Sequence, residues 1–165
     1  MRNFRAILPI LLLCLIFTGC TESSDREVPF APQRTPVNQI SFTEAEPNSP
    51  ATPQFLGMID VDTVYIADGS VSFTDSAMND DEFDSYTVTA SGDQTISILV
   101  RHDSSVDIDL AIVDPVTGNI LTELGDGVIS PEKISLTLTD GQTVAVEVEA
   151  FSGTGNYSVF IGSSK

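Results

Sequence analysis

From Ile40 to the end of the chain, apolar and polar residues alternate over short runs, and no window keeps a helical period near 3.6. The clearest run is 106–113, in which Val106, Ile108, Leu110 and Ile112 alternate with shorter or acidic side chains. A period of two is typical of a half-buried β-strand. The pattern predicts strands over 55–66, 71–73, 85–89, 95–100, 106–113, 120–124, 134–138, 143–151 and 156–161.

Turn-forming residues separate these runs at a spacing of roughly ten residues. The expected turns are 91–93, 117–119, 140–141 and 153–155, and each contains a glycine. Many short strands joined by regular turns favour an all-β fold, an antiparallel sandwich of two sheets. No internal repeat of fixed period is present.

The first twenty residues follow a different pattern. Arg2 and Arg5 precede an apolar run over 6–17, and Thr18-Gly19-Cys20 ends it. A basic start, a short apolar run and a small residue at the cut predict a cleaved secretory signal. The segment 17–20 resembles a lipobox, the signal of bacterial lipoproteins, and this resemblance implies that Cys20 becomes the lipidated N-terminus. The alternative is an ordinary cleaved signal with a chance cysteine.

Composition narrows the classes of partner. The chain has 7 Lys and Arg against 24 Asp and Glu, which gives a formal charge of −17. Cleavage of residues 1–19 would remove Arg2 and Arg5 and change the formal charge to −19. Phosphate binding needs clustered basic residues, so nucleic acid is excluded as a partner. Both cysteines, Cys14 and Cys20, lie in the signal region, which leaves the rest without a disulfide or thiol nucleophile.

Two acidic segments are candidate metal ligands. Glu44, Glu46 and Asn48 are spaced by two, and in an extended segment alternate side chains point to the same side. A second acidic stretch includes Asp81 and Asp84. Calcium takes six to eight oxygen ligands, and these groups suit it. The residues alone leave two interpretations open, a specific metal site or two solvated acidic loops.

Four motifs, in order, resemble the bacterial pre-peptidase C-terminal domain. They are E-A-E-P-N at 44–48, the acidic stretch D-E-F-D-S-Y at 81–86, V-D-I-D-L at 106–110 and G-T-G-N-Y-S-V at 153–159. The resemblance implies a jelly-roll-like β-sandwich over about 41–162. It also implies that calcium is held by Glu44, Glu46, Asn48, Asp81 and Asp84, with Ser49 or Ser76 as further oxygen donors. Thr143-Val144-Ala145-Val146 stands where collagen-binding members carry a Tyr-rich strand, so the resemblance does not extend to collagen binding.

Other polar groups have competing interpretations. Asp107 and Asp109 should point away from the apolar face of their strand, as an exposed acidic face, as caps of backbone amides or as a second metal site. Arg101-His102-Asp103-Ser104-Ser105 contains the residue types of a catalytic triad, but a triad needs side chains from separate segments. A carboxylate pair for glycoside hydrolysis remains an alternative, although the chain has no Trp for a sugar cleft.

The sequence thus predicts a signal peptide (1–19), a flexible tether (20–38) and one β-sandwich domain (39–165). We expect a non-catalytic lipoprotein of the bacterial cell envelope, anchored to the membrane through Cys20, with structural calcium. Thr21 follows the cysteine where an Asp would favour inner-membrane retention, which favours the outer membrane. The alternatives are an adhesion or substrate-targeting module that binds protein or polysaccharide without calcium, and a hydrolase.

Overall fold

The computed structural model describes residues 38–74, 81–125 and 130–164, all of them strand, turn or loop. The signal peptide, Cys20, Ser76 and the tether up to residue 37 lie outside these residues. The strands in the described part are β1 (Asn38–Thr43), β2 (Gln54–Ile59), β3 (Thr63–Phe73), β4 (Phe83–Ala90), β5 (Gln94–His102), β6 (Val106–Val113), β7 (Ile120–Leu124), β8 (Glu132–Leu138) and β9 (Thr143–Ser164). No helix in that part is long and apolar enough to cross a membrane.

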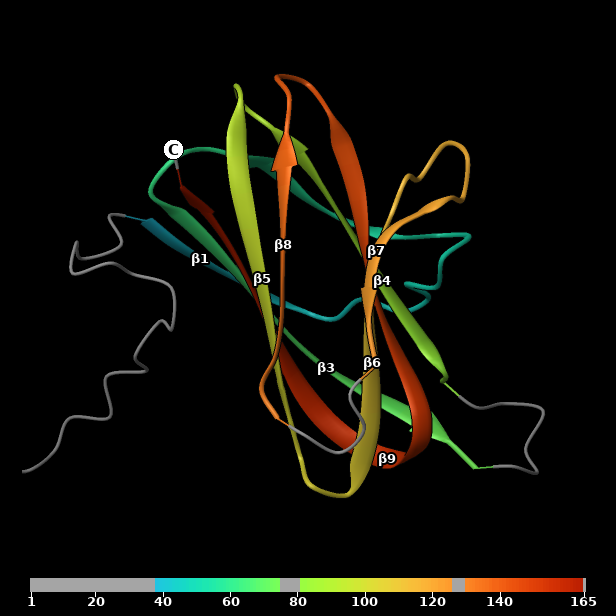
Figure 1. Ribbon diagram of the computed structural model, residues 1–165. Coiled ribbons are helices and arrows are strands. Elements are labelled where there is room, and N and C mark those ends of the chain that lie inside the picture. Colours follow the sequence, from blue (N-terminus) through green and yellow to red (C-terminus); the bar gives the residue numbers. More distant parts are fainter. Residues whose placement is uncertain (1–37, 75–80, 126–129, 165) are drawn as a thin grey trace, which may run out of the picture.

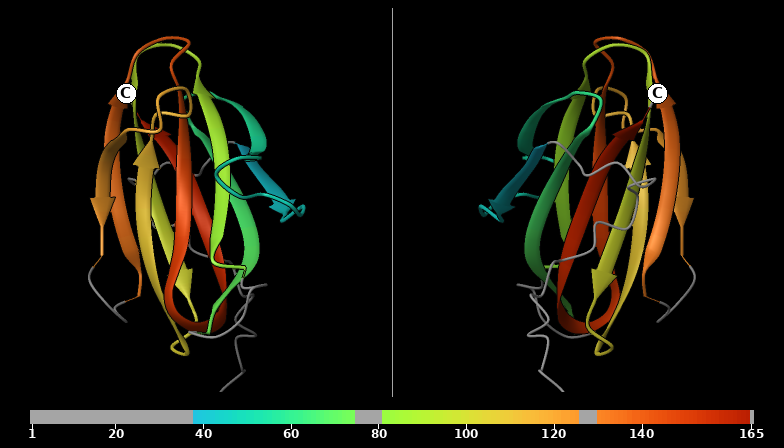
Figure 2. Two further views of the ribbon diagram at one scale, coloured as in Figure 1. Left: turned by 90° about the vertical axis from the view of Figure 1, so that its right-hand side faces the viewer. Right: turned by 90° about the vertical axis from the view of Figure 1, so that its left-hand side faces the viewer.

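The long strand β9 organises the fold, because its two ends belong to two different sheets (Figure 1). Its first part, from Thr143, lies between β4 and β6, which gives the order β2-β4-β9-β6-β7. Its second part, up to Ser164, lies between β3 and β5, which gives the order β1-β3-β9-β5-β8. Each panel of Figure 2 presents one of these halves to the viewer.

One apolar core holds the two halves together. Tyr86 and Val146 from the first half, and Ile98 and Val159 from the second, belong to the same cluster of buried residues. In β6, Val106, Ile108, Leu110 and Ile112 are at most 1 % exposed, and the residues between them face outward. The predicted all-β sandwich is therefore confirmed, and so is the predicted orientation of Asp107 and Asp109 away from the core. Two of its strand pairs, β1 with β3 and β2 with β4, are parallel rather than antiparallel.

The boundaries of several strands differ from the prediction. The predicted strand 55–66 is two strands, because Asp62 adopts a positive φ of 65° and turns the chain between β2 and β3. The predicted strands 143–151 and 156–161 are one continuous strand, and the predicted turn at 153–155 is a bend within it. Gly153 has a φ of 87°, and a Cβ there would overlap the Ser105 carbonyl oxygen. Only glycine permits both the bend and this close approach.

Candidate metal centre

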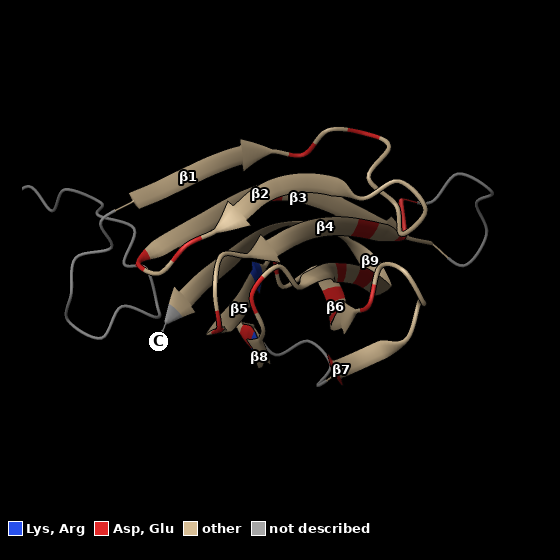
Figure 3. Ribbon diagram, turned by 90° about the horizontal axis from the view of Figure 1, so that it is seen from above, with Lys and Arg blue, Asp and Glu red and all other residues tan. Residues whose placement is uncertain are grey.

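The acidic segment that follows β1 joins the two sheets at one end of the sandwich. The amide of Glu44 donates to the Asp68 carbonyl at 3.1 Å, which continues the pairing of β1 with β3. Four residues later, the Asn48 carbonyl accepts from the Ser85 amide of β4 at 2.5 Å. The segment therefore crosses from the sheet that contains β3 to the sheet that contains β4, and Figure 3 shows acidic positions after β1 and at the start of β4.

Four carboxylates from these segments converge on one point. Each of Glu44, Glu46, Asp81 and Asp84 offers an oxygen that lies within 4.8 Å of the oxygens of the other three. Glu44 and Glu46 come from the segment after β1, whereas Asp81 and Asp84 lie just before and within β4. The structure thus brings together two pairs of acids that are more than thirty residues apart, as the sequence predicted.

Two buried oxygens of this cluster have no hydrogen-bond partner. Asn48 and Asp84 are both 0 % exposed, and Oδ1 of each is buried and unpartnered. Both nitrogen atoms of Asn48 are turned to the acids, because its Nδ2 donates to Glu44 Oε1 at 3.4 Å and its backbone amide to Glu46 Oε2 at 3.3 Å. Buried polar atoms in folded proteins normally have a partner, so two orphaned acceptors beside four carboxylates are an arrangement that a cation would complete.

The electrostatics of the cluster agree with that arrangement. Burial, then the neighbouring Asp84, raise the pKa of Glu44 to about 9, and burial with the charges of Asp84 and Glu46 raises the pKa of Asp81 to about 6. Burial also raises the pKa of Asp84, although its hydrogen bonds act in the opposite direction. Carboxylates held this close resist ionising together, and a divalent cation would remove that repulsion.

Asp84 is held by a tyrosine that the sequence analysis did not place in the site. The Tyr157 hydroxyl, from the second part of β9, donates to Asp84 Oδ2 at 2.6 Å. The Tyr86 hydroxyl lies 2.5 Å from the Tyr157 hydroxyl, inside the core. Burial raises the pKa of both tyrosines, which keeps their hydroxyl groups protonated. The only available signal was the tyrosine of the 153–159 motif, and its spacing along the chain does not reveal this contact.

The donor set fits a hard divalent cation. All the ligand atoms are oxygens, and four carboxylates with the Asn48 amide oxygen provide most of the six to eight ligands that calcium prefers. Of the other predicted donors, the Ser49 hydroxyl is hydrogen-bonded to the Thr52 hydroxyl at 3.2 Å. Softer metals would call for His or Cys ligands, and none of the four acids has such a neighbour in the cluster.

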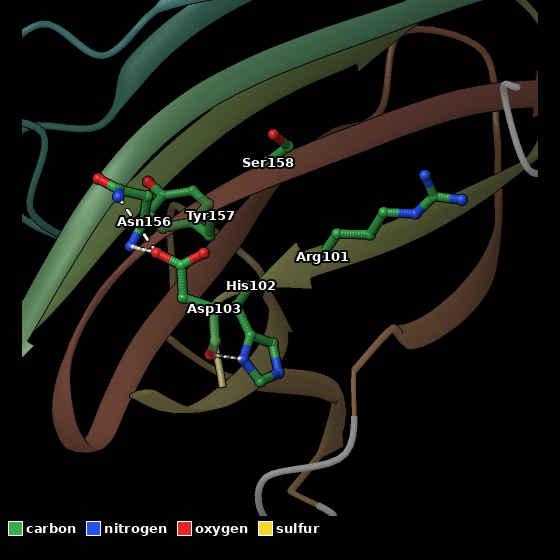
Figure 4. Close-up of a pocket in the computed structure, with 6 residues that line it drawn as sticks. All are labelled: Arg101, His102, Asp103, Asn156, Tyr157 and Ser158. Carbon is green, nitrogen blue, oxygen red and sulfur yellow. Dashed lines mark hydrogen bonds between the residues drawn. The ribbon is translucent and has the colours of Figure 1, made fainter. Parts of the chain in front are cut away.

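The segment with the residue types of a catalytic triad lies elsewhere and is arranged differently (Figure 4). His102 and Asp103 lie beside a shallow pocket of about 230 Å³. The Nδ1 atom of His102 contacts the backbone carbonyl of Asp103, not its carboxylate, at 2.9 Å. The carboxylate of Asp103 instead accepts from the amide and the side chain of Asn156, at 3.1 and 3.2 Å. The geometry is that of a braced turn that connects β5 to β6, which lie in different halves of the sandwich.

No model of a protein family matches the chain, and the search of curated proteins found no match. Among solved structures, the pre-peptidase C-terminal domain of collagenase from Bacillus anthracis is similar at 15 % identity and a TM-score of 0.49, covering 67 % of this chain and 93 % of that one. Carbohydrate-binding module CBM36 in complex with calcium and xylotriose is similar at 16 % identity and a TM-score of 0.33, with 58 % and 78 % covered. A family 35 carbohydrate-binding module from Clostridium thermocellum has 10 % identity and a TM-score of 0.33, with 59 % and 90 % covered. The first of these solved structures belongs to the family that the sequence motifs resemble.

Proposed function

We propose that the chain is a non-catalytic binding or accessory module of the bacterial cell envelope, and that calcium stabilises its β-sandwich. The ligands are Glu44, Glu46, Asn48, Asp81 and Asp84. The observation that carries the proposal is the pair of buried, unpartnered oxygens, Asn48 Oδ1 and Asp84 Oδ1, beside converging carboxylates. When bound, the ion neutralises the cluster and ties the segment after β1 to the start of β4, so that it joins the two sheets.

Thermal unfolding of the full chain, in mild detergent at fixed ionic strength, tests the calcium site. A ligand that binds only the folded state at a hundred times its Kd stabilises by about 2.7 kcal/mol. For a domain of this size we expect the melting temperature to rise by about 10 °C in calcium relative to chelator. Magnesium should give a smaller rise because it demands a tighter octahedral geometry.

Two variants link that rise to the site. The double variant Glu46→Ala with Asp84→Ala should lose the calcium-dependent rise, and the milder Glu46→Gln should reduce it while leaving the fold intact, because Glu46 is exposed. Asp62→Asn is the control, since it removes the same charge at an exposed position where asparagine also tolerates the positive φ. An undiminished rise in both site variants would exclude this cluster as the calcium site.

The envelope location is supported by residues 1–21 alone. The lipobox-like segment 17–20 supports lipidation of Cys20, and Thr21 supports the outer membrane. One acyl chain binds a bilayer only marginally, so stable anchoring requires several. In a bacterial host, labelled palmitate should enter the chain and be lost in Cys20→Ser, with Cys14→Ser as the matched control. Equal labelling of both variants would remove the lipoprotein assignment.

A further inference from the structure

A groove crosses the outer face of the sheet that contains β4, β9, β6 and β7. Its volume is about 510 Å³. Apolar side chains line part of it, among them Phe83, Ile120 and Leu124, and Ile120 is 58 % exposed.

Strand register places four acids in two rows across the groove. In the first row, Glu149 of β9 is paired with Asp109 of β6. In the second row, Glu147 of β9 is paired with Ala111, which in turn is paired with Glu123 of β7. Figure 3 shows the acidic positions on β6 and on the neighbouring part of β9. Each row therefore holds two carboxylates, and successive rows are about 7 Å apart along the strand.

Two small residues make this face hollow. Ala111 lies between the longer side chains of Glu147 and Glu123, which leaves a depression at the middle of the second row. At Gly125 a Cβ would lie 2.9 Å from Asp109 Oδ1, so only glycine leaves that carboxylate in place. The groove thus has a narrow, partly apolar floor between acidic sides.

The spread of the acids argues against a second metal ion. Among the described residues, the only group of three or more acids whose oxygens all lie within 4.8 Å of one another is Glu44, Glu46, Asp81 and Asp84. The groove acids are instead distributed over three strands, in two rows with apolar side chains beside them. A single ion does not use such a surface, whereas an extended ligand with spaced cationic side chains matches it, because the aliphatic stems of those side chains can pack on the apolar residues.

We propose that this groove binds an extended basic peptide, with cationic side chains at alternate positions. One guanidinium group would contact Glu149 and Asp109, and the next would contact Glu147 and Glu123. In an extended peptide, alternate side chains point to the same side about 7 Å apart, which is the spacing of the two rows. Arginine suits each row because its planar fork binds carboxylates through two hydrogen bonds.

Charge complementarity supports this occupant over a neutral one. No Lys or Arg is among the described residues that line the groove. Burial raises the pKa of Glu147, and burial with neighbouring acids raises the pKa of Glu149 and of Asp109. The carboxylates therefore repel one another in the free protein, and a cationic ligand relieves that repulsion on binding. The inference rests on the proposed role as a binding module, and none of the proposed calcium ligands is among the residues that line the groove.

Fluorescence anisotropy with the full chain tests the proposal. The probe is a labelled, end-blocked peptide Gly-Arg-Leu-Arg-Gly, and we expect saturable binding that weakens as salt rises. The same peptide with citrulline in place of arginine keeps the shape and loses the charge, and should bind at least about tenfold more weakly. Gly-Arg-Arg-Leu-Gly has the same composition with adjacent charges, and should also bind more weakly because one arginine then points away.

Variants locate the site. Glu147→Gln with Glu149→Gln should weaken binding of the arginine peptide at least about tenfold, and Glu147→Gln alone should weaken it less. Asp62→Asn, which removes one charge at an exposed turn, should leave binding unchanged. Unchanged melting temperatures would show that the groove variants are folded. Equal losses in Asp62→Asn and the groove variants would overturn the proposal, because binding would then depend only on net charge.

Two further arms separate this site from the calcium site and from another ligand class. Peptide binding should persist in chelator at a temperature where the chain stays folded. Binding without any calcium-dependent rise in melting temperature would overturn the calcium proposal and leave this one standing. A clear calcium effect without peptide binding would overturn the peptide proposal and leave the calcium proposal standing. Binding of a neutral xylo-oligosaccharide in the groove, with no binding of the arginine peptide, would overturn the inference.

Discussion

The Tyr157 hydroxyl determines which oxygen of Asp84 is free for a cation. It donates to Oδ2 at 2.6 Å, whereas Oδ1 is buried and has no hydrogen-bond partner. Tyr157→Phe removes a hydrogen bond to a charged group, and such bonds contribute about 1.5–3 kcal/mol. We expect weaker calcium binding in titration calorimetry, because the carboxylate loses the contact that orients it, and a lower melting temperature in chelator.

Tyr86→Phe is the matched control for that change. Because the Tyr157 proton is committed to Asp84, Tyr86 donates to the Tyr157 oxygen, and its loss removes a bond between neutral groups. Such bonds contribute about 0.5–1.5 kcal/mol, so stability should fall by less, and calcium affinity should change little. If the two variants lost calcium affinity equally, the tyrosines would serve only as core packing.

Protonation of the cluster predicts how stability depends on pH without calcium. The pKa of Asp81 rises from 3.8 to about 6 and that of Glu44 from 4.5 to about 9, so the folded state holds more protons than the unfolded state between these values. Stability from this source is complete below pH 4 and is lost as pH rises toward 9. We expect the melting temperature of calcium-free protein to fall between pH 5 and pH 8, and saturating calcium to remove most of that fall.

A melting temperature that rose over that range without calcium would contradict the assignment. Asp81→Asn tests the origin of the effect, because it removes one of the groups whose pKa is raised on folding. The variant should show a shallower pH dependence in chelator than Asp62→Asn, which changes the same charge away from the cluster.

At the scale of the element, β9 depends on Gly153 to pass from one sheet to the other. Its φ of 87° is costly for any other residue, by about 1–2 kcal/mol, and a Cβ would also overlap the Ser105 carbonyl oxygen. Gly153→Ala should therefore destabilise the fold by more than that strain alone. Gly118 also has a positive φ, 71°, but nothing lies within 4 Å of its Cβ position, so Gly118→Ala isolates the strain. Denaturant unfolding compares the two variants, and equal losses would mean that β9 tolerates the alanine at its bend.

Sequence periodicity predicted the elements that are buried on one face, and it failed where tertiary contacts decide the local structure. The run 106–113 became β6 with its apolar and polar faces as predicted. The glycines of 153–155 have the composition of a turn, yet pairing with β3 and β6 keeps this stretch within β9. Strand β1 has only two apolar positions, Ile40 and Phe42, which is too short a pattern to predict a strand. Its parallel pairing with β3 is a tertiary contact that the local sequence does not indicate.

The sequence predicted which acids form the cluster, and it missed the tyrosine that contacts one of them. Alternate spacing in an extended segment was enough to place Glu44 and Glu46 on one side, and the family resemblance paired them with Asp81 and Asp84. The contact of Tyr157 with Asp84 depends on how the two halves of the sandwich face each other, which no spacing along the chain encodes. The same holds for the groove, because its two acidic rows exist only through the register of β6, β7 and β9.

For the whole molecule, charge is the dominant long-range term. A chain with a formal charge of −17 repels itself in the compact state, and the acid cluster adds short-range repulsion to this diffuse one. Sodium chloride screens the diffuse term, since the Debye length falls from about 30 Å at 0.01 M to about 3 Å at 1 M. Salt should therefore reduce the long-range repulsion of the whole chain, and calcium should reduce the short-range repulsion within the acid cluster.

Thermal unfolding across a matrix of salt and calcium concentrations separates the two effects. In chelator, raising sodium chloride from about 0.01 M to about 0.5 M should raise the melting temperature, and potassium chloride should do the same, because screening does not distinguish the two ions. Calcium should add a further rise at every salt concentration, since direct coordination by partly buried carboxylates is screened far less than exposed charge. A calcium effect that vanished at about 0.5 M salt would show that calcium acts only as a divalent counterion of an acidic surface. A persistent effect that Glu46→Gln reduces and Asp62→Asn does not would assign it to the centre that joins the two sheets.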